Sequence, residues 1–262
     1  MKYIVFFLFV FILTFSLDAK ALKELRIATY IEEPFSYIKN NRLVGENIEI
    51  AKVLAESLNL EPIFIHCPFA RCLAMVKNGH ADMIFGLRRF PEREINLTFI
   101  SPPYVIQYYP LRFFTLKSAN KSITKFSDLQ NLTVGTLRGA TYFDQFDKNT
   151  QIKKIEVTTR EQLVNMLLKN RFDTFLDREE SIEPLLSQEE YNKKFSLAKF
   201  QYDKADATYI AISKLSRINN FTKELKQQLT KLIADGTIGK IIAKRIHAHP
   251  KNSSKNQIVT KM

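Results

Sequence analysis

The sequence has 262 residues, of which 45% are hydrophobic and 25% are charged, and its formal net charge is +12. This length is sufficient for one large domain or two modest domains with buried cores. The positive charge favours anionic ligands or an acidic membrane surface, but the lysines and arginines are scattered along the chain. Because there is neither a basic base-reading helix nor an aromatic RNA-binding signature, we expect no nucleic-acid partner.

The first 21 residues predict a secretory signal peptide. Lys2 precedes a long apolar run, and the small-x-small sequence Ala19-Lys20-Ala21 follows, which is the order of regions in such a peptide. An uncleaved membrane anchor is the alternative, but a spanning helix needs roughly 20 apolar residues. We therefore expect residues 1–21 to be removed and the mature protein to be soluble and periplasmic.

Strands and helices alternate in the first half of the chain. Strands are predicted at residues 25–29, 62–66 and 81–85, and helices are predicted to begin after Gly45 and at Phe69. In the first of these helices apolar residues recur every four positions, which places one apolar stripe against a sheet. A β-α-β-α-β order indicates a largely parallel sheet that is covered on both faces.

Residues 79–104 contain the most informative pattern. A short strand leads into a polar turn at residues 86–89, and a helical turn that carries Arg93 follows. Strand ends and helix N-termini of α/β sheets face a common crevice in which ligands bind, and arginine binds carboxylates in bidentate fashion. The alternative interpretation is that Arg93 is a solvated cation paired with Glu92 or Glu94.

The second half repeats the β-α-β-α-β order after an extended connector at residues 108–116. Residues 207–212 are predicted to be a return connector, and a long amphipathic helix and a short last helix, flanked by Gly236 and Gly239, follow it. Two similar halves joined by two extended crossings predict a hinged pair of α/β lobes with a ligand cleft between them. Strands of the second half are predicted at residues 132–135, 152–157, 172–176 and 195–198.

The chain has only two cysteines, Cys67 and Cys72. Export makes a disulfide chemically possible, but two residues five apart in a continuous helix exceed the limit of roughly 7 Å between the Cα atoms of a disulfide. A bridge therefore requires Cys67 to precede the helix, which Pro68 at the first helical position permits. The sequence leaves the disulfide and two separate thiols as open alternatives, and it predicts no metal site.

Several motifs, in this order, resemble a known family. They are LRIATY, EPFSY, GHADMIFG, PERE, FISPPY, SDLQNLTVGTLRGAT and RFDTFLD. The chain is similar, from about Leu25 to Ile246, to the family 3 periplasmic solute-binding proteins, the extracytoplasmic receptors of polar amino-acid ABC importers. This resemblance implies an α/β, two-lobed periplasmic-binding-protein fold with two hinge crossings (type II). The expected parts are lobe 1 at residues 22–110 and 208–247, lobe 2 at residues 111–207, and a disordered basic tail at residues 248–262.

The resemblance also assigns ligand contacts. In the family, an arginine at the position of Arg93 holds the ligand α-carboxylate, together with backbone N–H groups of a turn that here reads Gly139-Ala140-Thr141. An acidic residue at the position of Asp177 holds the α-ammonium group. The alternative for Asp177 is that it caps the helix at Ser181 or pairs with Arg178.

An aromatic side chain of the first loop stacks on the ligand in this family, although such rings are also common core residues. Arg88 departs from the family pattern, which commonly has serine or threonine there; the arginine either reaches a second acid group of the ligand or occludes the amino-acid site. The remaining candidates for the pocket are Tyr30, Phe35, Phe69, Glu32 and Gly86.

The expected function is that of a monomeric periplasmic receptor that closes two lobes on a small polar ligand. The ligand is expected to be an amino acid or a related carboxylate, and the partner a membrane ABC permease; no cofactor is expected. The first alternative is a dehydratase-like enzyme on the same scaffold, with Glu32, His66 or His80 as the acid-base group. The second is a sensor or interaction protein that does not bind amino acids.

Overall fold

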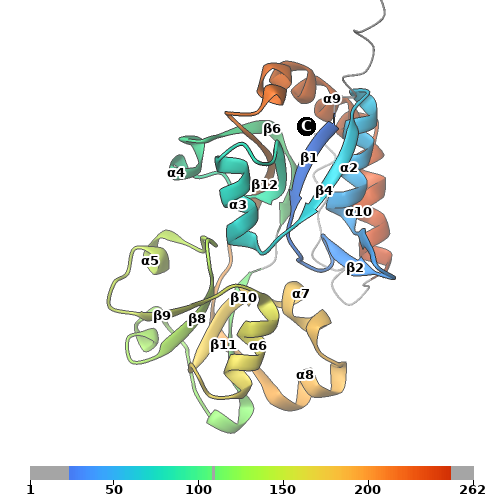
Figure 1. The fold of residues 1–262 in the computed structure, drawn as a ribbon. Coiled ribbons are helices and arrows are strands. Elements are labelled where there is room, and N and C mark those ends of the chain that lie inside the picture. Colours follow the sequence, from blue (N-terminus) through green and yellow to red (C-terminus); the bar gives the residue numbers. More distant parts are fainter. Residues whose placement is uncertain (1–23, 108–109, 249–262) are drawn as a thin grey trace, which may run out of the picture.

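The computed structural model of the protein describes residues 24–107 and 110–248 (Figure 1). The predicted signal peptide lies outside the described residues, and so does the predicted tail from residue 249 onward. Within the described ranges no helix is long and apolar enough to cross a membrane.

The chain forms two lobes, and each is built on a five-stranded sheet (Figure 1). The first sheet has the order β4-β1-β5-β12-β6, and the second has the order β11-β7-β10-β8-β9. The strands of the first sheet are β1 (Glu24–Thr29), β4 (Glu61–His66), β5 (Met83–Leu87), β6 (Leu97–Gln107) and β12 (Asp206–Ser213). Those of the second are β7 (Leu111–Leu116), β8 (Thr133–Leu137), β9 (Lys153–Val157), β10 (Thr174–Arg178) and β11 (Phe195–Tyr202).

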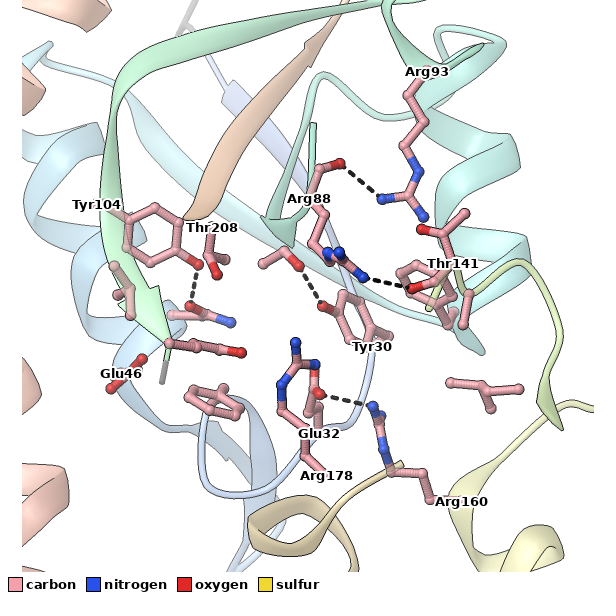
Figure 2. Close-up of a pocket in the computed structure, with 18 residues that line it drawn as sticks. Tyr30, Glu32, Glu46, Arg88, Arg93, Tyr104, Thr141, Arg160, Arg178 and Thr208 are labelled. Carbon is pink, nitrogen blue, oxygen red and sulfur yellow. Dashed lines mark hydrogen bonds and ion pairs between the residues drawn. The ribbon is translucent and has the colours of Figure 1, made fainter. Parts of the chain in front are cut away.

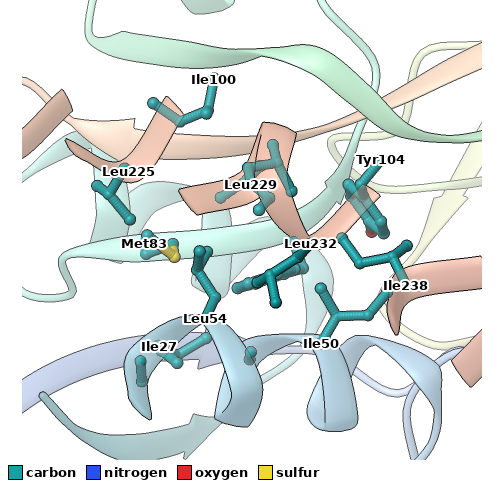
Figure 3. Packing of buried hydrophobic residues seen from close by; sticks show 14 of the residues in the cluster. Ile27, Ile50, Leu54, Met83, Ile100, Tyr104, Leu225, Leu229, Leu232 and Ile238 are labelled. Atoms are coloured by element: carbon teal, nitrogen blue, oxygen red, sulfur yellow. The ribbon is translucent and has the colours of Figure 1, made fainter. Parts of the chain in front are cut away.

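Helices cover both faces of the first sheet, as its apolar strands require. One face packs against α2, α9 and α10, where Leu54 of α2 and Leu229 of α9 are fully buried beside strand residues such as Met83 (Figure 3). The other face packs against α3. The elements of this lobe besides its sheet are α2 (Glu46–Ser57), α3 (Phe69–Lys77), α4 (Pro91–Glu94), η4 (Arg217–Phe221), α9 (Thr222–Ala234), α10 (Thr237–Ala248) and the hairpin β2 (Tyr37–Lys39) and β3 (Arg42–Val44).

The second lobe has a core rich in phenylalanine. The rings of Phe114 and Phe175, on neighbouring strands, stack with their centroids 4.6 Å apart. Gly135 of β8 faces the ring of Phe172 so closely that a Cβ atom there would lie 2.6 Å from it, which explains a glycine inside this strand. The other elements of this lobe are η1 (Lys117–Ala119), η2 (Phe126–Leu129), α5 (Asp144–Asp147), α6 (Arg160–Leu168), α7 (Glu179–Ile182), η3 (Glu183–Leu185) and α8 (Gln188–Lys194).

The two-lobed α/β architecture predicted from the sequence is confirmed, but both predicted connectors are wrong. Residues 111–116 form β7, an inner strand between β11 and β10, and residues 207–212 lie in β12, an inner strand between β5 and β6. Both strands run antiparallel to their neighbours, so the first sheet is mixed and not largely parallel. The chain passes between the lobes from β6 to β7 and from β11 to β12, just before each of these strands.

The last helix also differs from the prediction. It is not a short segment between two glycines, because α10 runs for 12 residues from Thr237 and includes Gly239. The buried side chains of Ile238, Ile241 and Ile242 pack on the first lobe, and this burial outweighs the low helix propensity of one glycine.

We expect Leu54→Ala to lower the free energy of unfolding by about 2–5 kcal/mol, because it removes buried methyl groups and leaves a cavity. Leu54 is 0% exposed in the core of the first lobe. The matched control is Glu56→Ala, an exposed residue of the same helix, which should change stability by less than about 0.5 kcal/mol. Urea denaturation of both variants makes the measurement, and equal midpoints would contradict this account of the core.

Candidate functional site

A pocket with a volume of about 70 Å³ lies between the lobes and is lined by residues of both (Figure 2). Most of the lining follows strand C-termini, as expected for an α/β sheet. Every predicted site residue except Asp177 contributes to it. These residues are Glu32, Phe35, Phe69, Gly86, Arg88, Arg93, Ala140 and Thr141, together with the candidate Tyr30.

Gly86 has a steric role in the pocket wall. Its φ angle is +82°, and a Cβ atom there would lie 2.5 Å from the hydroxyl of Tyr30. That hydroxyl donates a hydrogen bond to the carbonyl oxygen of Gly86 over 3.1 Å. The glycine therefore allows β5 and the loop after β1 to approach each other at the pocket.

Arg93 is a buried cation in the pocket lining. It is 6% exposed, and its guanidinium donates to the carbonyl oxygens of Arg88 over 3.0 Å and Gly139 over 3.3 Å. Among the described residues no carboxylate forms an ion pair with it, and Glu94 pairs instead with Arg89. Burial lowers the pKa of Arg93 to about 10, and the charge of Arg88 adds to the lowering. The predicted alternative, a solvated ion pair, therefore does not describe Arg93.

Arg88 bridges the two lobes. One of its terminal nitrogens donates to the carbonyl oxygens of Thr141, over 3.1 Å, and Tyr142. The other pairs with Asp206 Oδ1 over 2.8 Å. Burial lowers the pKa of Arg88, and Asp206 opposes this effect. The terminal nitrogens of Arg88 are thus engaged by the protein, and the side chain forms a wall between the lobes.

Asp177 lies behind the pocket lining and is bound by Arg160. Arg160 Nε donates to Asp177 Oδ2 over 2.9 Å, while a terminal nitrogen of the same guanidinium donates to Glu32 Oε1 over 2.7 Å. Burial raises the pKa of Asp177, and Arg160 opposes this rise. Burial alone would lower the pKa of Arg160, but Asp177 and Glu32 raise it above its usual value. A cation of the protein therefore lies beside the carboxylate that the family pattern assigns to a ligand ammonium group.

Ala140 does not present its amide to the pocket as the family pattern implies. Its N–H donates to the carbonyl oxygen of Leu137 over 3.0 Å, within the turn itself. The hydroxyl of Thr141, which lines the pocket, is buried and has no hydrogen-bond partner among the described residues. The side-chain hydroxyl is thus a donor of this turn that the described residues leave unused.

The structure pairs Cys67 with Cys72 in a disulfide, with their Cα atoms 5.4 Å apart. The helix α3 begins at Phe69, after Pro68, so Cys67 precedes the helix as a bridge requires. The Phe69 ring packs edge-on against Tyr30 with centroids 4.7 Å apart. The bridge thus constrains the chain on either side of Phe69, an aromatic residue of the pocket.

Phe35 and Phe69 are both buried and both line the pocket. Each ring can therefore be part of the core and also offer a surface on which a ligand stacks.

Four charged residues of the site, Glu46, Arg160, Arg178 and Asp206, were missed by sequence reasoning. Arg160 is the first residue of α6, directly after Thr159, whose side chain caps that helix. This cap follows a strand, so the sequence contained a signal for Arg160 at a strand C-terminus. Arg178 was considered only as a partner of Asp177, but its side chain lines the pocket and pairs with Asp206. Nothing in the local sequence pattern singles out Asp206.

We expect Glu32→Gln to weaken the contact between the lobes, because Arg160 then loses its anionic partner in the first lobe. The radius of gyration from small-angle X-ray scattering should increase relative to the wild type. The matched control is Glu156→Gln, which removes an exposed pair with Arg138 inside the second lobe and should leave the radius unchanged. Equal radii for all three proteins would show that Arg160 does not hold the lobes together.

Comparison with known proteins places this site in a family. The family model of bacterial extracellular solute-binding proteins, family 3, matches residues 25–247. A curated relative, the arginine-binding extracellular protein ArtP of Bacillus subtilis, is 25% identical over 207 residues, which cover 74% of this chain and 76% of ArtP.

Solved structures share the fold. The amino acid ABC transporter substrate-binding protein AbpA from Streptococcus pneumoniae, bound to L-arginine, has a TM-score of 0.70 and 22% identity, over 87% of this chain and 95% of that one. The ancestral amino acid-binding protein AncCDT-1, a precursor of cyclohexadienyl dehydratase, has a TM-score of 0.65 and 20% identity, over 84% of this chain and 94% of that one. Because the family model covers nearly all of the described residues, the chain belongs to the bacterial extracellular solute-binding proteins of family 3.

Proposed function

We propose that this protein captures a small carboxylate-bearing solute, an amino acid or a related carboxylate, between its two lobes and delivers it to an ABC permease. The observation that carries the proposal is Arg93, a buried guanidinium in the pocket lining whose acceptors among the described residues are neutral carbonyl oxygens. A buried charge is costly unless it is paired, so a ligand carboxylate at Arg93 would relieve an existing cost. The names of ArtP and AbpA, both associated with arginine, support an amino acid-like ligand.

Thr141 supports a carboxylate at the same place. Its buried hydroxyl lacks an acceptor among the described residues, while Arg93 contacts Gly139 in the same turn of the second lobe. A carboxylate bound by both side chains would contact both lobes at once. Such a ligand shifts the balance towards the closed arrangement, because it gains its full affinity only there.

The size of the pocket implies that the lobes move. Its volume of about 70 Å³ is small compared with the roughly 300–1,000 Å³ of typical ligand pockets. Arg88 and Arg160 close it by contacts across the lobes. The proposed cycle is therefore that the lobes separate about the two crossings, admit the ligand and close on it, with residues 22–110 and 208–247 as one moving part and 111–207 as the other.

The proposed role is binding and not catalysis. His66 and His80, the histidines considered as acid-base groups, are exposed and lie outside the pocket lining. Glu32, the acid considered for the same role, is held by Arg160. The predicted signal peptide supports export, and we propose that a monomer, released by cleavage after Ala21, meets its permease outside the cytoplasm.

We expect Arg93→Ala to abolish stabilisation by the ligand. A thermal-shift screen of residues 22–262 against amino acids, dicarboxylates, polyamines and small peptides should find a compound that stabilises the wild type. At about 100 times the dissociation constant, bound ligand adds about 2.7 kcal/mol. The control is Arg89→Ala, which removes an exposed arginine paired with Glu94 and should retain the shift. A shift that survives Arg93→Ala, or the absence of any shift, would refute the proposal.

A further inference from the structure

We infer that the ligand is a short dicarboxylate, with or without an α-amino group, and that Arg178 binds its second acid group. This inference rests on the carboxylate-binding function proposed above and specifies its ligand class. It follows from the hydrogen bonds of the polar groups around the pocket. Most carboxylate oxygens there already accept hydrogen bonds from the protein. Arg178 Nε and the Thr141 hydroxyl, in contrast, have no partner among the described residues.

Three acidic groups around the pocket already accept hydrogen bonds from arginines. Asp206 accepts from Arg88 at one oxygen and from Arg178 at the other. Asp177 accepts from Arg160 and from the backbone N–H of Arg178. Glu32 Oε1 accepts from both Arg160 and Ser181. Glu46, the remaining acid of the lining, is 4% exposed and likewise interacts with another group. A cationic ligand side chain would therefore compete with the resident arginines for Asp206, Asp177 and Glu32.

Arg178 has the opposite character. Its terminal nitrogen pairs with Asp206, but its Nε is buried and has no acceptor among the described residues. An unsatisfied buried donor is unfavourable, and a hydrogen bond to a charged acceptor is stronger than one to a neutral acceptor. A ligand carboxylate at Arg178 Nε would satisfy this donor.

The guanidinium groups of Arg178 and Arg93 lie on different sides of the pocket. In Figure 2, Arg178 approaches the pocket from below and Arg93 lies above it. A ligand with an acid group at each end fits this arrangement, whereas a ligand with one acid group leaves Arg178 unsatisfied. The small pocket favours a short carbon chain. A guanidinium ligand would find the acids Asp206, Glu32 and Asp177 already bound to arginines of the protein, in contrast to the arginine named for ArtP.

The test is isothermal titration calorimetry of residues 22–262 with L-glutamate, L-aspartate, glutarate, succinate, L-glutamine and L-arginine. At least one dicarboxylate should bind at least about tenfold more tightly than L-glutamine and L-arginine, as expected for one additional charged hydrogen bond. Comparison of L-glutamate with glutarate, and of L-aspartate with succinate, shows whether the α-amino group contributes. Tighter or equal binding of L-glutamine or L-arginine would overturn the inference.

Variants of Arg178 test the assignment of the residue. Arg178→Gln should reduce the preference for the bound dicarboxylate over L-glutamine by at least about tenfold, and Arg178→Lys, which keeps the charge, should reduce it less. The control Arg138→Gln removes an exposed arginine of the same lobe and should preserve the preference. A preference that persists in a folded Arg178→Gln protein would overturn the role of Arg178.

The outcomes separate this inference from the proposed function. If L-arginine or L-glutamine binds best and its binding is lost in Arg93→Ala, the carboxylate-binding function stands and the dicarboxylate inference is wrong. If no member of the panel binds the folded wild type, both are wrong. The wild-type comparison decides the ligand class even if an Arg178 variant fails to fold.

Discussion

The burial of Arg160 between one acid of each lobe is the interaction on which the pocket geometry depends. The side chains of Arg160, Glu32 and Asp177 are 11%, 13% and 5% exposed. Removing one partner of such a buried pair leaves a charge unpaired, which costs about 3–5 kcal/mol. The loop after β1, the start of α6 and the end of β10 are therefore held in one mutual arrangement. In the same arrangement, Arg88 and Arg93 of the first lobe donate to carbonyl oxygens of the second lobe.

Much of the fold could be predicted because local patterns carry it. The apolar stripe of α2 and the alternation of β1, α2, β4, α3 and β5 are visible in the sequence, and the structure contains them. The strands β7 and β12 were misinterpreted because they have no helix partner that marks them as part of a β-α-β unit. Both pair antiparallel with strands that are distant in the chain, and single-sequence patterns contain no information on such pairing.

The sequence could indicate where most residues of the site lie, but it could not indicate which hydrogen bonds and ion pairs they form. The resemblance predicted Glu32, Arg88, Arg93 and Thr141 as pocket residues, and they line one pocket, whereas the predicted Asp177 does not line it. The sequence could not show that Arg160 binds Asp177, since that depends on which rotamer of a long side chain fills the space between the lobes. Similarly, the role of Arg88 follows from carbonyl oxygens of the other lobe, which have no signature in the amino-acid sequence.

The position of β12 in the first sheet has a consequence for the order of assembly. This strand separates β5 from β6, yet it follows the whole of the second lobe in the chain. While the chain emerges from a ribosome or a translocation channel, the second sheet is complete once β11 has appeared. The first sheet still lacks an inner strand at that moment, and β6 has no neighbour to pair with. The lobe that holds both ends of the described chain is therefore the last to close its hydrogen-bond ladder.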